Sequence, residues 1–154
     1  MTAKEYLRNI RDEQKEIRIL EKKRDGIILN SAKPTGIRYD KVRVQSSPKD
    51  PMEVFEHWSE LETEICEHID LLQKNRAEAI RLIRKINQST YRQILMLYYL
   101  TPKNDKEMMS WHDVASEMRY SDDRIWHLHG NALQEFSRVY AAKNKNKRRQ
   151  KKAD

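Results

Sequence analysis

A long apolar stripe constrains this chain of 154 residues more than any other feature of its sequence. Between residues 58 and 86 its members recur at alternating spacings of three and four, the period of an amphipathic helix. The pattern predicts one long helix that begins near Asp50-Pro51, since proline is favoured at the first helical position. We interpret the two polar members, His68 and Asn75, as register markers within the seam. The full stripe is Trp58, Leu61, Ile65, His68, Leu72, Asn75, Ala79, Leu82 and Ile86, widened by Ile69, Ile80 and Ile83.

A weaker heptad pattern between residues 3 and 27 predicts a first helix. Its two charged members, Glu13 and Arg24, make the seam imperfect. We expect this helix and the long one to form an antiparallel, coiled-coil-like hairpin; a homodimer through the same stripe is the alternative. The seam residues are Ala3, Tyr6, Ile10, Glu13, Ile17, Leu20, Arg24 and Ile27.

The segment 29–51 between the two helices holds three of the four prolines and breaks every helical period. Within it, "IRYDKVRVQ" alternates apolar and polar residues, which favours a short strand or an extended segment. We interpret the segment as an ordered crossover. The helical domain is predicted to cover residues 1–87.

Two short helices near the end of the chain have the pattern of a helix-turn-helix, in a domain predicted over residues 88–141. A preceding helix ends at Thr101-Pro102, because the residue before proline is pushed out of the helical region. Ser110 and Asp113 resemble a capping box, and the small Ala115 lets the two helices cross closely. The residues expected to face inward are Val114, Ala115, Met118, Ile125, Leu128, Ala132 and Phe136. The predicted fold class is therefore all-α.

The second of these helices leaves a strip of side chains on its outer surface. Ser121 can cap the helix, and Asp122 and Asp123 fall in its first turn, where negative charge is favourable. Capping therefore explains the aspartates without any function. The outward residues are Asp122, Asp123, Trp126, His127 and Asn131.

The net charge of +7 is concentrated at the end of the chain. Residues 143–154 carry seven Lys or Arg and one Asp, whereas residues 88–142 carry six basic and seven acidic residues. We predict a basic, disordered tail over residues 142–154, and an arm that contacts nucleic acid is compatible with it. Because phosphate neutralisation supplies most of the affinity for DNA, the 88–142 module alone should bind duplex weakly. The tail, a second copy or another protein must add affinity.

Other classes of protein find little support in the sequence. His127 and His129 lie about 200° apart around a helix and cannot chelate one metal ion together. We expect no cofactor and no enzymatic activity, since no phosphate-binding glycine loop or nucleophile with a base is present. The single Cys66 forms no internal disulfide, and no apolar run reaches the length of a membrane span. A cytoplasmic protein is expected.

Three stretches of the sequence resemble those of a known family. "SWHDVASEMRYSDDRIWHLHGNALQEF" resembles region four of bacterial sigma factors. Together with "YDKVRVQSSPKDPM" and "YRQILMLYYL", the chain from about residue 3 to 138 resembles phage-encoded, sigma-like proteins related to the RinA and ArpU late-transcription regulators of Gram-positive phages. The resemblance implies a phage or prophage transcription regulator in a host bacterial cell, bound to promoter DNA together with host RNA polymerase.

The resemblance also implies roles for individual residues. Asp122, Asp123 and His127 would read bases, and Arg124, Trp126 and Asn131 would lie near phosphates. The chain departs from the family pattern in three ways. Asp122 is acidic where the family commonly has a basic residue, and Trp126 and Asn131 occupy positions where Arg or Lys is usual. Arg119 replaces the glycine that usually precedes the turn. The predicted DNA-binding set is Ser121, Asp122, Asp123, Arg124, Trp126, His127, Asn131, Lys147, Arg148 and Arg149. The rival hypothesis is a helical adaptor that binds a protein and uses the helix-turn-helix as a scaffold.

Overall fold

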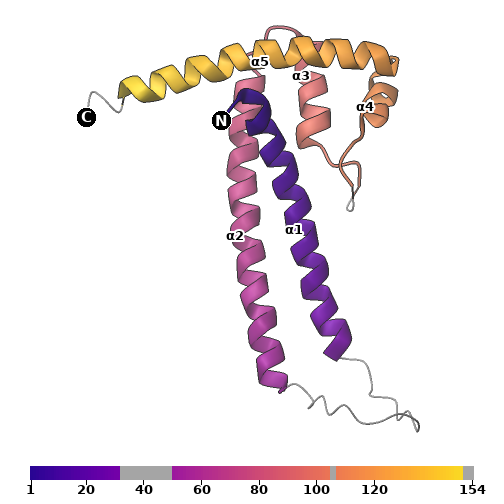
Figure 1. Cartoon of the computed structure of the whole chain (residues 1–154), viewed down its shortest axis with the longest axis vertical. Coiled ribbons are helices and arrows are strands. Elements are labelled where there is room, and N and C mark those ends of the chain that lie inside the picture. Colours follow the sequence, from indigo (N-terminus) through magenta and orange to yellow (C-terminus); the bar gives the residue numbers. More distant parts are fainter. Residues whose placement is uncertain (32–49, 105–106, 151–154) are drawn as a thin grey trace. The chain divides into compact units, whose positions relative to one another are not determined.

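The chain is helical in the computed structural model, which describes residues 1–31, 50–104 and 107–150 (Figure 1). Its α-helices are α1 (Ala3–Ser31), α2 (Pro51–Ile83), α3 (Ser89–Leu95), α4 (Trp111–Met118) and α5 (Asp122–Gln150). A π-helical turn, η1 (Met96–Leu100), continues α3. Within the described residues the extended pairing is limited to a single bridge between Pro102 and Met108. The all-α prediction is confirmed. The strand or extended segment expected in "IRYDKVRVQ" lies outside the described residues.

The helices belong to two compact units, which do not follow the order of the chain. One unit combines residues 1–15 with residues 71–154, and the other comprises residues 16–70. The predicted domain limits, 1–87 and 88–141, remain a prediction.

The unit of residues 16–70 contains the second half of α1 and the first part of α2. Ile17 of α1 and Leu61 and Ile65 of α2 are buried. Arg24 pairs with Glu62 at 2.7 Å and also with its neighbour Asp25. The charged heptad position at Arg24 is thus occupied by an ion pair at the edge of the seam, which explains how the imperfect heptad is tolerated.

In the other unit, the first four turns of α1 pack along the last part of α2. The Tyr6 hydroxyl lies 3.4 Å from the Asn75 carbonyl and 3.4 Å from Glu78, while Arg76 reaches Gln14 at 3.3 Å. The predicted apolar stripe is buried here, as expected: Leu72, Ala79, Leu82 and Ile86 are each at most 5% exposed.

The end of η1 is stabilised by arginines from two other helices. The last carbonyls of a helix have no partner within it. Arg76 of α2 donates to the Leu100 carbonyl, and Arg11 of α1 donates to the carbonyls of Tyr98 and Met109. The helix stops at Thr101, before Pro102, as the sequence predicts.

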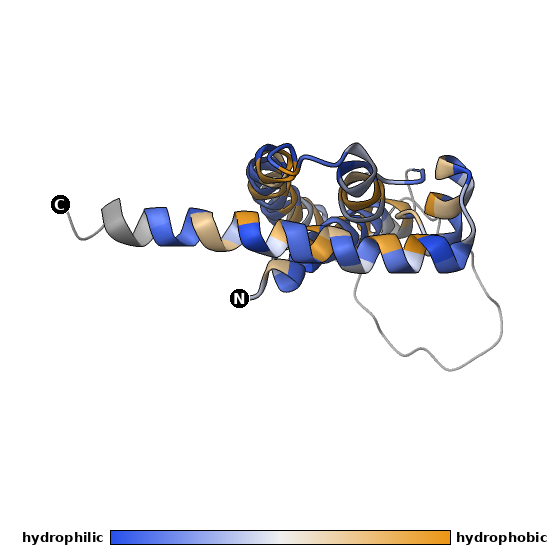
Figure 2. Ribbon diagram, turned by 90° about the horizontal axis from the view of Figure 1, so that it is seen from above, coloured by the Kyte–Doolittle hydropathy of each residue, from blue (hydrophilic) through white to orange (hydrophobic). Residues whose placement is uncertain are grey.

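Helix α5 is much longer than its sequence-based boundary. Residues 142–150, assigned above to a disordered tail, continue the helix to Gln150. No proline or glycine interrupts "AAKNKNKRRQ", and Ala, Lys and Arg are good helix formers. Along α5, Figure 2 shows patches of apolar and polar residues, as in a helix that buries one face.

Candidate nucleic-acid interface

The site is built from the start of α4. The Ser110 hydroxyl accepts from the Asp113 backbone N–H at 3.2 Å, and the Asp113 carboxylate accepts from the Ser110 N–H at 2.8 Å. The predicted capping box is therefore confirmed, with Asp in place of Glu or Gln. Lys103 lies 2.7 Å from the same carboxylate. The Lys103 ammonium and the Ser110 hydroxyl together hold the pKa of Asp113 well below its usual range.

The turn between α4 and α5 depends on Arg119. This residue has φ 56° and ψ 42°, the left-handed conformation that favours glycine. Its N–H reaches the carbonyls of Ala115 and Ser116, and the Tyr120 N–H donates to the Ala115 carbonyl at 2.9 Å. The turn thus takes the geometry that a glycine would give, at the expense of strain in an arginine.

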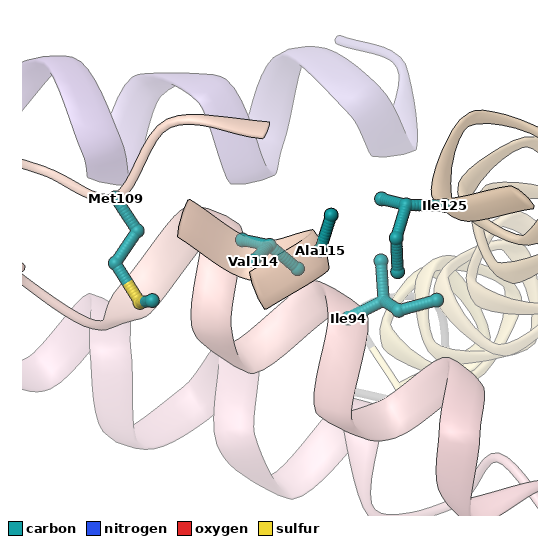
Figure 3. Close-up of a cluster of buried hydrophobic side chains, with 5 residues drawn as sticks. All are labelled: Ile94, Met109, Val114, Ala115 and Ile125. Carbon is teal, nitrogen blue, oxygen red and sulfur yellow. The ribbon is translucent and has the colours of Figure 1, made fainter. Parts of the chain in front are cut away.

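A shared core fixes α4 and α5 together with α3. It contains Ile94, Met109, Val114, Ala115 and Ile125, which come from four segments. Figure 3 shows Ile94 and Ile125 facing each other beside Ala115. Ala115 is only 2% exposed, which fits the predicted close crossing of the helices. The remaining inward predictions hold as well. Ala132 and Phe136 are buried, and Met118 and Leu128 pack partly buried against the core or its edge.

The first turns of α5 present the predicted strip to the outside. Ser121, Asp122, Asp123, Arg124, Trp126, His127 and Asn131 are all exposed. The Ser121 hydroxyl accepts from the Arg124 N–H at 3.4 Å, and the two aspartates lie in the first turn as expected. Their roles in DNA recognition remain predictions.

Two charged side chains of the strip contact neighbouring side chains. Asp122 lies 3.4 Å from the imidazole of His112 on α4, and the Arg124 guanidinium lies 4.5 Å from the centre of the Tyr120 ring. Two aspartates and one arginine leave the strip with a net negative charge. The strip therefore provides shape and hydrogen-bonding groups, and it provides little attraction for phosphates.

Trp126 has an aromatic neighbour that the sequence did not reveal. Its ring lies 5.0 Å from that of Trp111, and Trp111 stacks on Tyr98 with ring centres 3.6 Å apart. The two tryptophans lie on different helices, fifteen positions apart in the chain. Only the tertiary arrangement of α4 and α5 brings them together, so no local pattern could have predicted the pair.

The two histidines of α5 have different environments. His129 is 5% exposed, and its Nε2 shares a hydrogen bond of 3.1 Å with the Tyr99 hydroxyl. Burial, with a smaller effect of the Lys4 charge, lowers the pKa of His129 to about 4. His127 is exposed. His129 is therefore a buried residue of α5.

Lys147, Arg148 and Arg149 lie in the last turns of α5. A straight helix rises 1.5 Å per residue, which places Lys147 about 30 Å beyond His127. These three residues are therefore separated from the exposed strip by most of the length of the helix.

Known proteins do not assign this site. No protein-family model, curated protein or solved structure matches the chain. Within residues 1–31, 50–104 and 107–150, no three His, Cys, Asp or Glu side chains are grouped to hold a metal ion. In the same part of the chain, no helix is both long and apolar enough to cross a membrane.

Proposed function

We propose that the chain is a DNA-binding transcription regulator of the sigma-like kind, in which α4, the turn 119–121 and the first turns of α5 form a helix-turn-helix. The supporting observation is the exposed strip at the start of α5, held rigid by a core shared with α3 and α4. A helix that enters the major groove reads bases with the residues of its first turns. Asp122 and Asp123 would accept from cytosine amino groups, and His127 would contact a further base edge.

The long helices form an antiparallel hairpin in this proposal. Contacts between α1 and α2 occur in opposite order along the two helices, from Tyr6 with Glu78 to Gln14 with Arg76. Within the other unit, Arg24 pairs with Glu62, which also joins α1 to α2. Host RNA polymerase is the proposed partner that adds affinity, because the net negative strip binds phosphates poorly. A homodimer would serve the same purpose.

The basic end of α5 contributes long-range attraction in this scheme. Its distance of about 30 Å from His127 exceeds the Debye length of about 8 Å at physiological salt. Lys147, Arg148 and Arg149 should therefore strengthen duplex binding at low salt and have less effect at physiological salt.

Fluorescence anisotropy with labelled duplex DNA over a range of salt concentrations tests this function. A variant with Lys147→Gln, Arg148→Gln and Arg149→Gln should lose affinity mainly at low salt and keep its preference among sequences. Loss of all binding in this variant, together with no sequence preference in the unmodified chain, would contradict the proposal.

The alternative is an adaptor that binds a protein through the same strip. Its support is the net negative charge of the strip and the 54% exposure of Trp126, since tryptophan is enriched at protein interfaces. An adaptor would bind duplexes without sequence preference. Recovery of a stoichiometric protein complex that survives nuclease treatment would favour it.

A further inference from the structure

A hollow lies beside the aromatic residues of α4 and α5, in the unit that combines residues 1–15 with residues 71–154. Its volume is about 190 Å³, and residues from α1, η1, α4 and α5 line it. Pockets for drug-sized ligands usually measure about 300–1,000 Å³. The hollow therefore suits one small planar group, with the remainder of the ligand at its open side.

One wall of the hollow is a column of stacked groups. The Arg11 guanidinium lies 4.0 Å from the centre of the Tyr98 ring, and Trp111 stacks on Tyr98 at 3.6 Å. At these distances the two must cover opposite faces of Tyr98. Trp126 follows Trp111 at the end of the column and is half exposed. An aromatic ring at this position offers a surface on which a heterocyclic base can stack.

The part of the hollow that α1 lines is basic. Lys4, Arg8, Arg11 and Lys15 of α1 line it with one acid, Asp12. Asp12 pairs with Lys15 at 2.9 Å. Among the described residues, the Arg11 guanidinium donates to two backbone carbonyls and pairs with no carboxylate. Within the described part of the chain, the side chains of Lys4 and Arg8 form neither a hydrogen bond nor an ion pair, and the Arg8 charge acts on nearby Glu5.

We propose that this hollow binds a nucleotide, with its base against Trp126 and Trp111 and its phosphate beside Lys4 and Arg8. A phosphate offers several acceptor oxygens to such a group of cations. An aromatic amino acid fits less well, because its ammonium would face the same cations. The nucleotide can be free in solution or an unpaired nucleotide of a strand. The proposed nucleotide binding does not depend on the proposed duplex binding, since a free nucleotide or an unpaired nucleotide of a strand can occupy the hollow.

Tryptophan fluorescence provides the test, because two of the three tryptophans line the hollow. A Trp58→Phe background removes the third, which belongs to the other unit. AMP should quench the emission in a saturable way. Adenosine, which has no phosphate, and ribose 5-phosphate, which has no base, should each bind at least about tenfold more weakly.

Three variants locate the binding. Trp126→Ala keeps Trp111 as a reporter and should weaken AMP binding by about tenfold or more, and Lys4→Ala with Arg8→Ala should do the same. Lys23→Ala is the matched control: it removes one exposed lysine of α1 that does not line the hollow, and it should leave the affinity unchanged.

An oligo(dA) single strand identifies the source of the nucleotide. If oligo(dA) binds more strongly than AMP, the nucleotide belongs to a strand. If it binds more weakly, the ligand is a free nucleotide. Either result supports the site. Absence of saturable quenching with both AMP and the strand would overturn the proposal. Equal affinity in the Lys4→Ala, Arg8→Ala variant would overturn it as well. Duplex binding is measured separately by anisotropy, so either claim can fail while the other stands.

Discussion

Arg119 adopts the strained left-handed backbone conformation that the turn between α4 and α5 requires. A left-handed backbone costs a residue with a side chain roughly 1–2 kcal/mol, which glycine avoids at some cost in chain entropy. Arg119→Gly should therefore raise the free energy of unfolding by about 0.5–1 kcal/mol. Chemical denaturation measures the change. Arg119→Ala removes the same side chain and keeps the strain, so a comparable gain in that variant would contradict the explanation.

His129 should make stability depend on pH. Its pKa is lowered to about 4 by burial, against about 6.5 in an unfolded chain. As the pH falls through 6.5, the His129 imidazole becomes protonated in the unfolded state, whereas in the folded state it is protonated only near pH 4. Stability should therefore fall between pH 6.5 and 4 by about 2 kcal/mol, allowing for solvent screening, and this contribution should be constant below pH 4.

Denaturation at several pH values tests this dependence. His129→Gln, which cannot titrate, should flatten the change between pH 6.5 and 4. The exposed His127→Gln is the control and should retain it. An equal slope in His129→Gln and the unmodified chain would show that another group is responsible.

At the scale of the elements, the end of η1 relies on side chains from elsewhere. Arg76 donates to the Leu100 carbonyl, and burial lowers the pKa of Arg76 without removing its charge. Arg76→Met keeps an apolar stem and leaves this carbonyl unpaired, which should cost about 1.5–3 kcal/mol of stability. Arg81→Met changes an exposed arginine of the same helix and should cost less than about 0.5 kcal/mol. Equal costs in the two variants would contradict a role for the Leu100 carbonyl.

Most of the elements could be predicted from the sequence because their signals are local. Spacing of the apolar residues identified the stripe of α2, and Asp50-Pro51 marked its start. The capping box marked the start of α4, and Pro102 marked the end of η1. By contrast, the continuation of α5 to Gln150 was missed, since a run of lysines suggests a solvated tail as readily as a helix. The aromatic column and the arginine contacts to carbonyls join distant parts of the chain, which no local pattern encodes.

At the scale of the whole molecule, the exposed strip and the basic end of α5 belong to one continuous helix. A rigid helix keeps the basic end away from phosphates that flank the strip. The outward positions of the strip were predicted correctly, because helical periodicity and the core determine them. Its proposed role in DNA recognition is tested by binding experiments.

Selection of duplexes from a random library tests the central claim most directly. The unmodified chain should enrich one motif. His127→Ala should relax the preference at one base pair by about 1–3 kcal/mol, whereas Ser137→Ala, an exposed change beyond the strip, should preserve it. Enrichment of no motif by the unmodified chain would contradict sequence-specific recognition by α5.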